Sequence, residues 1–171
     1  MLRFLAAALG LLWLVGALTS CANYRLGTGS APTFGSVYVE PVTNRTLVPQ
    51  AQAILSARIR EGFLRDARVR PVNDGATAEA RLTLVLTEYR RDIAAARESD
   101  TGLARKFNIT LTALGTLRDQ RSGKVLWENR PFTVMREVFT DGGQLQAEYE
   151  VIPLLADSLA QRIIHAALDS W

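Results

Sequence analysis

Two segments in the middle of the chain alternate between apolar and polar residues, and this pattern constrains the fold more than any other feature of the sequence. Every second residue of 82–87 is leucine, with Thr83, Val85 and Thr87 between them. Residues 107–117 repeat the pattern, with mostly threonine between the apolar residues. Because successive side chains of a strand point to opposite faces, both segments are predicted to be strands with one face toward a core and a threonine-rich face away from it.

Two other segments have helical periodicity. Between residues 48 and 65, apolar residues recur every four positions, and Pro49 suits a first helical turn. A second apolar stripe predicts a closing helix after a loop at 140–146, with Pro153 in its first turn. The stripes consist of Leu47, Ala51, Leu55, Ile59 and Phe63 in the first helix and of Ile152, Leu155, Leu159 and Ile163 in the second.

Three more strands are predicted from β-branched and aromatic runs, at residues 37–42, 68–72 and 125–139. The first is followed by turn-forming residues at 43–46. The last forms a hairpin with the strand before it, through a turn at 119–124 in which Gly123 is available for a positive φ. Pro131 cannot donate to a strand ladder, so this last strand is predicted to bulge there or to lie at an edge.

The order of elements is therefore strand, helix, four strands and helix (β-α-β-β-β-β-α), which is typical of the α+β class. In a single domain, the simplest packing places both helices on one face of a four- to five-stranded mixed or antiparallel sheet.

The first twenty residues differ in composition from the rest. Arg3 supplies a positive start, and residues 4–17 form an uncharged apolar run that is shorter than the roughly 20 residues needed to span a bilayer. Small residues precede Cys21, the only cysteine of the chain. This pattern predicts a cleaved lipoprotein signal peptide and a lipid attached to the Cys21 thiol, in preference to an ordinary signal peptide or a buried helix.

The predicted organisation has three parts: a signal peptide at 1–20, a lipidated cysteine and flexible tether at 21–34, and a globular domain at 35–171. Gly27, Gly29, Ser30 and Pro32 give the tether its composition. Ala22 follows the cysteine where an aspartate would signal inner-membrane retention in enterobacteria. We therefore expect the outer membrane, with the protein anchored by its lipid and facing the periplasm.

The charge pattern excludes one class of partner and leaves another open. The formal net charge is +3, and it falls to +2 when Arg3 is removed, which argues against nucleic-acid binding. Residues 90–124 hold eight basic and four acidic groups. This segment either docks an anionic partner, such as the phosphates of lipid A, or simply keeps the surface soluble.

Catalysis is not predicted. His165 is the only histidine, and it shares the polar side of the last helix with Arg162 and Asp169. With no second histidine and no free thiol, neither a nucleophile triad nor a His/Cys metal site can be assembled. We expect no enzyme activity, no metal and no cofactor, and a lipid-anchored hydrolase is the least favoured of the functions considered.

Taken in order, several short motifs resemble the LptE family of lipopolysaccharide-assembly lipoproteins. They are the start at 21–26 with its cysteine, tyrosine and arginine, the strand and Asn-Arg-Thr turn at 39–46 with the helix after it, and the hairpin at 119–127. The resemblance spans nearly the whole mature chain.

The resemblance implies a plug inside the lumen of an outer-membrane β-barrel, LptD, and a role in inserting lipopolysaccharide into the outer leaflet. It also implies that basic residues near one end of the sheet bind the phosphates of lipopolysaccharide. The positions that match best are Arg97, Arg105 and Lys106. A second basic position expected before the last helix is missing, since residues 140–148 contain no lysine or arginine.

A second resemblance leads to an alternative function. The first strand, the Asn-Arg-Thr turn and the helix also look like lipoproteins that activate peptidoglycan synthases, the penicillin-binding proteins. Those proteins regulate an enzyme and do not fill a barrel, so the protein that copurifies would discriminate the two hypotheses.

Overall fold

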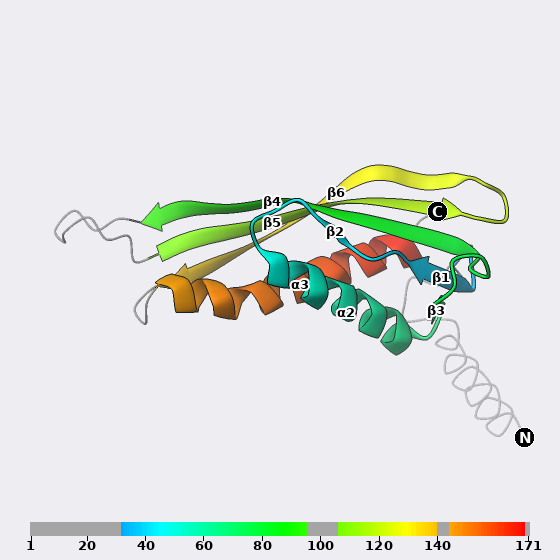
Figure 1. The fold of residues 1–171 in the computed structure, drawn as a ribbon, viewed down its shortest axis with the longest axis horizontal. Helices are drawn as coiled ribbons and strands as arrows, with labels where there is room; N and C mark the ends of the chain where they lie inside the picture. The colour runs from blue at the N-terminus through cyan, green and yellow to red at the C-terminus, as the bar shows by residue number, and fades with distance from the viewer. Residues whose placement is uncertain (1–31, 96–105, 140–143, 170–171) are drawn as a thin grey trace, which may run out of the picture. The chain divides into compact units, whose positions relative to one another are not determined.

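The computed structural model describes residues 32–95, 106–139 and 144–169 (Figure 1). The predicted signal peptide and most of the predicted tether lie outside these residues. The described elements, in chain order, are β1 (Ser36–Val39), β2 (Thr43–Asn44), α2 (Pro49–Asp66), β3 (Arg70–Val72), β4 (Ala80–Ala95), β5 (Lys106–Asp119), β6 (Val125–Phe139) and α3 (Gln144–Leu168).

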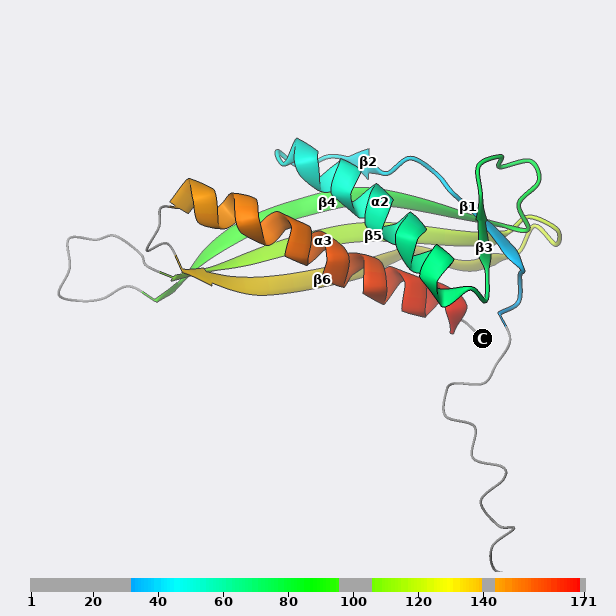
Figure 2. The same cartoon turned by 90° about the horizontal axis from the view of Figure 1, so that it is seen from below.

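One mixed sheet contains all the strands, in the order β3-β1-β4-β5-β6, with the short β2 also paired to β4. The strand β1 runs parallel to β3 and β4, whereas β5 runs antiparallel to both β4 and β6. The helices α2 and α3 lie together on one face of this sheet (Figure 2). The predicted α+β class and element order are confirmed, and β2 is the one strand that the sequence did not predict.

The core lies between the helices and the sheet. The leucines of β4 at 82, 84 and 86 and the alternate residues of β5 face the helices and are buried, as predicted. Gly62 of α2 lets the helices approach closely, because a Cβ built there would lie 2.1 Å from Cδ1 of Ile164 in α3. Phe34 is 2 % exposed, so packing against the core begins two residues before β1.

The start of α2 differs from the prediction in its first residues. Asn44, which was predicted to lie in a turn, pairs with Leu86 of β4. Its side chain then organises the turn that follows, since Asn44 Oδ1 accepts from the Thr46 amide at 2.8 Å and Nδ2 donates to the Val48 carbonyl at 3.0 Å. Leu47 lies in this turn and is 98 % exposed, so its predicted place on the apolar stripe was wrong.

The helix α3 begins earlier than predicted. It starts at Gln144, so part of the predicted loop at 140–146 is helical, and Pro153 lies inside the helix and not in its first turn. The helix is long and apolar enough to cross a membrane by length and composition, but half of its most apolar stretch is buried within the domain. Its apolar face from Val151 to Leu168 forms one side of the core.

The edge position of β6 agrees with the prediction made from Pro131. This strand is the last in the sheet, and its register with β5 shifts between Gly115 and Leu117. Asn129 has a φ of 47° at the same irregularity, and its amide donates to Thr116 Oγ1 at 3.1 Å. Gly123 in the preceding turn has a φ of 70°, as the turn prediction required.

Candidate functional site

Of the residues predicted to function, the structure describes only one of the proposed ligand-binding cations. Cys21, Arg97 and Arg105 lie outside the described residues. Lys106 is the first residue of β5 and pairs in register with Phe139, the last residue of β6. It therefore lies at the end of the sheet from which the 96–105 segment leaves. We call this region the loop end; it comprises the last residues of β4 and β6, the first of β5 and the first turns of α3 (Figure 1).

Lys106 is already partnered. Its Nζ lies 2.6 Å from Oε2 of Glu137, and 5.5 Å from the centroid of the Phe139 ring. The carboxylate neutralises most of the lysine charge locally, so an anionic ligand would have to compete with Glu137 for it. The ring supplies an apolar surface directly beside the charged group.

Two other cations near the loop end, Arg90 and Arg91, are also paired with carboxylates, whereas Arg136 of β6 donates to the Ser158 hydroxyl at 3.3 Å. Arg90 on β4 has Nε 3.2 Å from Asp92 and 3.7 Å from Glu88, on the face of the sheet that the helices leave uncovered. Arg91 points to the helix side, where it forms an ion pair with Glu148 of α3. Uncompensated positive charge at this end must therefore come from residues other than Arg90 and Arg91.

Glu148 ties α3 to β4 through several hydrogen bonds. Besides Arg91, it accepts from the Tyr89 hydroxyl at 3.2 Å and from Gln144 Nε2 at 3.0 Å. Burial by itself raises the pKa of Glu148, but the hydrogen bonds from Gln144 and Arg91 outweigh it and the pKa is lowered. Burial, together with the charge of Glu148, raises the pKa of Tyr89 to about 12. The carboxylate is thus ionised and the phenol neutral at neutral pH.

Exposed apolar side chains lie on both sides of the sheet toward the loop end, and the sequence did not predict them. They come from three elements and are more than half exposed: Ile93, Met135, Phe139, Leu145 and Tyr149. These residues lie on two sides of the sheet. Met135 and Phe139 point to the uncovered face, whereas Ile93 pairs in register with the buried Phe107, and Leu145 and Tyr149 belong to α3 on the helix side. Each side therefore offers some exposed apolar surface near this end.

The sequence of β6 contains an indication of this exposure. Met135 and Phe139 are an odd number of residues from the buried Val134 and Val138, so they point to the opposite face of the strand.

The uncovered face of the sheet is mainly polar, apart from Met135 and Phe139 toward the loop end. At its centre, the hydroxyls of Thr112 and Thr133 lie 3.1 Å apart, and Thr112 also contacts Glu88 at 3.2 Å. These polar groups form hydrogen bonds with one another, and neither α2 nor α3 lies above them. Such a face can rest in water or against another polar surface.

The basic segment 90–124 does not form one patch. Arg118 pairs in register with Arg81 at the far end of β4 and β5, eight residues along the strand from Thr110, the partner of Arg90. At about 3.4 Å per residue, this separation is roughly 27 Å. Arg121 is likewise engaged elsewhere, since it donates to the Thr33 carbonyl at 3.0 Å. The described members of this segment therefore belong to opposite ends of the domain.

His165 lies on the polar side of α3, as predicted. Its side chain is 75 % exposed, and its Nδ1 lies 2.7 Å from Asp169. In the part of the chain that the structure describes, no group of three or more histidine, cysteine, aspartate or glutamate side chains is placed to hold a metal.

Solved structures place this fold among bacterial lipoproteins. Lipoprotein B from Nitrosomonas europaea is 18% identical, with a TM-score of 0.59, and the match covers 85% of this chain and 90% of that one. A minor lipoprotein from Acinetobacter baumannii is 20% identical, with a TM-score of 0.52 and coverages of 78% and 91%. The rare lipoprotein B from Shewanella oneidensis is 16% identical, with a TM-score of 0.51 and coverages of 77% and 92%. No match was found among curated proteins.

The fold is thus that of an α+β lipoprotein domain. The chain belongs to the LptE family, whose model, described as "Lipopolysaccharide-assembly", matches residues 34–167. The resemblance found in the sequence motifs is confirmed. Membership makes this a lipoprotein of lipopolysaccharide assembly, associated with a membrane and with the lipopolysaccharide-transport machinery, in a family that is not one of enzymes.

Proposed function

We propose that this protein is an outer-membrane lipoprotein that plugs the LptD barrel, assists its assembly and binds lipopolysaccharide during insertion into the outer leaflet. The family match over residues 34–167 carries the proposal. The fold contributes a rigid sheet with one uncovered polar face, and the loop end contributes apolar groups beside cations.

The proposed anchor is a lipid on Cys21. The lipid would insert into the inner leaflet of the outer membrane, so that the domain faces the periplasm. A single acyl chain binds membranes only marginally, so stable attachment requires more than one. The proposed tether ends where Phe34 enters the core. Thirteen residues at up to about 3.5 Å each allow roughly 45 Å between the lipid and the domain, enough to reach into a barrel from its periplasmic side.

The proposed contact with the barrel wall is the uncovered face of the sheet. The lumen of a large outer-membrane barrel is polar. Where the charges of this threonine-rich face are mutually paired, as in the group of Arg90, Glu88 and Asp92, the face can lie against such a wall without burying an unpaired charge.

The proposed ligand surface is the loop end. Arg97, Arg105 and Lys106 would engage phosphate, which guanidinium groups bind in a bidentate manner. The exposed ring of Phe139, which lies beside Lys106, would contact acyl chains. Because Glu137 competes for Lys106, the arginines carry most of the proposed phosphate contact.

The alternative function, activation of a penicillin-binding protein, is not favoured by the family match. The two hypotheses are separated by a pull-down of the tagged full chain from detergent-solubilised membranes, with partners identified by mass spectrometry. We expect an LptD-type barrel in stoichiometric amount. A penicillin-binding protein in its place, or no barrel at all, would refute the proposed function.

A further inference from the structure

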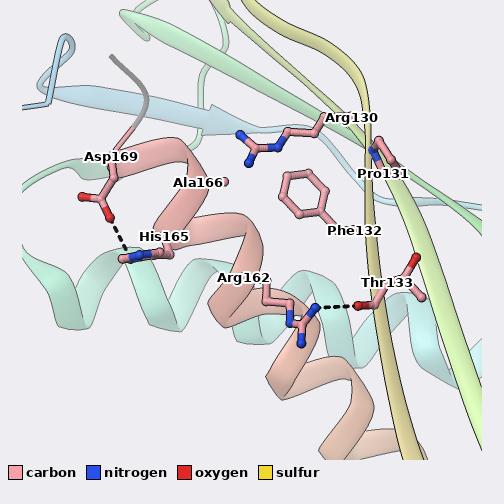
Figure 3. Close-up of a pocket in the computed structure, with 8 residues that line it drawn as sticks. All are labelled: Arg130, Pro131, Phe132, Thr133, Arg162, His165, Ala166 and Asp169. Carbon is pink, nitrogen blue, oxygen red and sulfur yellow. Dashed lines mark hydrogen bonds and ion pairs between the residues drawn. The ribbon is translucent and has the colours of Figure 1, made fainter.

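A cavity of about 460 Å³ lies between β6 and the last turns of α3, away from the loop end (Figure 3). Thr133, which lines it, is six residues along β6 from Phe139, a separation of about 20 Å at the usual rise of a strand. The lining residues are Arg130, Pro131, Phe132 and Thr133 of β6 and Arg162, His165, Ala166 and Asp169 at the end of α3.

Two guanidinium groups in this cavity are held in place by uncharged partners. Arg162 donates from Nη1 to the backbone carbonyl of Thr133 at 2.9 Å, which positions its side chain across the gap between helix and strand (Figure 3). Arg130 lies over the ring of Phe132, with its Cζ 5.5 Å from the ring centroid. Phe132 is itself fixed by an edge-to-face contact with Trp127, at 5.5 Å between centroids. Both cations are therefore positioned without being neutralised.

The charges of these two arginines are not balanced nearby. Within the described ranges, no carboxylate lies within the 4.0 Å ion-pair distance of Arg130 or Arg162. The carboxylate that lines the cavity, Asp169, already faces His165 at 2.7 Å and Arg68 at 3.6 Å. The cavity is thus lined by two cations that have no ion-pair partner among the described residues, and by one carboxylate, Asp169, that is already paired.

We infer that this cavity binds a phosphate monoester between Arg130 and Arg162. A phosphate monoester carries a charge of about −1.5 to −2 near neutral pH and three acceptor oxygens, which match two guanidinium groups better than the single charge and two oxygens of a carboxylate. The volume suits a ligand of the size of a phosphorylated sugar or glycerol. The site shares no residue with the proposed ligand surface at the loop end, although Thr133, whose carbonyl holds Arg162, also belongs to the uncovered face of the sheet.

The test is an NMR titration of the purified full chain in detergent, with ¹⁵N-labelled arginine, that follows the Nε–Hε signals. Glycerol 3-phosphate is the soluble probe, lipid A in mixed micelles is the headgroup probe, and acetate is the carboxylate probe. We expect saturable shifts at Arg130 and Arg162 with one or both phosphate probes, and the probe that saturates identifies the source. Acetate should bind at least tenfold more weakly.

Two single variants and two controls complete the design. Arg130→Gln and Arg162→Gln should each weaken phosphate binding at least tenfold. Arg58→Gln, which removes an arginine paired with Glu61 on the exposed side of α2, should leave it unchanged. Charge reversal of Arg97, Arg105 and Lys106 should leave the glycerol 3-phosphate shifts at Arg130 and Arg162 unchanged while it weakens lipopolysaccharide binding, which separates this site from the proposed ligand surface at the loop end.

Several results would overturn the inference. They are the absence of a saturable shift with either phosphate probe, equal binding of acetate, or an Arg130→Gln variant that binds as well as the parent chain. Because Arg162 also contacts the β6 backbone, the amide spectrum of each variant must match that of the parent. If Arg162→Gln fails to fold, Arg130→Gln, which removes no backbone contact, decides the question.

Discussion

At the residue scale, the proposed lipidation of Cys21 would decide whether the domain stays at a membrane. Cys21→Ala removes the thiol that the proposed lipid requires, so the variant should lose the incorporation of radiolabelled palmitate entirely and appear in the soluble periplasmic fraction. Asn23→Ala, two residues further on, is the matched control and should keep both label and membrane association. Labelling of the alanine variant, or a mature wild-type chain whose sulfur is unmodified, would contradict the lipoprotein assignment of this cysteine.

Lys106 shows that a basic side chain at the loop end can already be engaged in an ion pair, here with Glu137. Replacing Arg97, Arg105 and Lys106 together by glutamate should weaken lipopolysaccharide binding to the purified chain at least tenfold, about 1.4 kcal/mol, because three phosphate partners become repulsive. Surface plasmon resonance with immobilised lipopolysaccharide measures this.

The matched control for that experiment is the other end of the same basic segment. Arg118, Arg121 and Lys124 changed to glutamate alter the net charge equally but lie at the far end of the sheet, so binding should stay close to that of the parent. Equal losses in both triple variants would mean that the segment acts only through overall charge. Glu137→Gln tests the competition directly, since freeing Lys106 should tighten binding.

At the element scale, most of the fold could be predicted because periodicity reports burial. The strand 125–139 was predicted with the bounds that it has, and α2 to within a residue at each end. The length of β4 could not be predicted. A register shift between Leu86 and Glu88 reverses the alternation of faces along β4. Before the shift the even-numbered residues face the helices, and after it the odd-numbered Tyr89 and Arg91 do. A pattern read with a constant period of two loses the strand at such a bulge.

The first turns of α3 were missed for a related reason. The apolar stripe begins at Val151, and the residues before it are polar or exposed, which is typical of a loop. What fixes these turns is the contact of Glu148 with Tyr89 and Arg91, a tertiary interaction between residues nearly sixty positions apart. Nothing local in the sequence reports such a pairing.

That contact makes the docking of α3 dependent on pH. The pKa of Glu148 is lowered in the folded state, so its contribution to stability is present above the pKa of the unfolded chain and is lost as the pH falls through the lowered value. Glu148→Ala should therefore lower the free energy of unfolding by about 1 kcal/mol at pH 7. The difference from the parent should shrink as the pH falls below the ordinary pKa of a glutamate and disappear below the lowered pKa of Glu148.

Urea denaturation followed by circular dichroism, at a series of pH values, measures this difference. Glu150→Ala is the control on the same helix, because Glu150 is exposed and bonds only to Gln146 among the described residues. It should change stability little at any pH. A loss at Glu148 that persists unchanged in acid would show that the carboxylate charge is not what holds α3 to β4.

At the scale of the whole molecule, the sequence could predict which face of the sheet is core and which is not, but not what gathers at each end. Arg90 and Arg118 are close in the sequence, yet the long β4–β5 pairing separates them. Conversely, the cavity joins Arg130 and Arg162, which no motif connects. The distribution of charge along the sequence gives its distribution in space only when the register of the strands is known.

The uncovered face gives a test of how the domain sits in its proposed partner. Thr112 and Thr133 lie side by side at the centre of this face, where no helix covers them. Changing both to arginine should alter stability by no more than about 0.5 kcal/mol each, since the substitutions are on the surface and Glu88 is near. In a barrel lumen, however, two long cations would have to displace the wall or be desolvated without partners, which costs several kcal/mol.

We therefore expect the double arginine variant to fold and to remain lipidated, but to lose at least nine-tenths of the barrel recovered in the pull-down. The matched control is Thr112→Ser with Thr133→Ser, which keeps both hydroxyls and should recover the barrel as the parent does. Normal recovery with the arginines in place would mean that this face points to water in the complex. Because the helices cover the opposite face of the sheet, contact with the wall would then have to be made by α2 and α3.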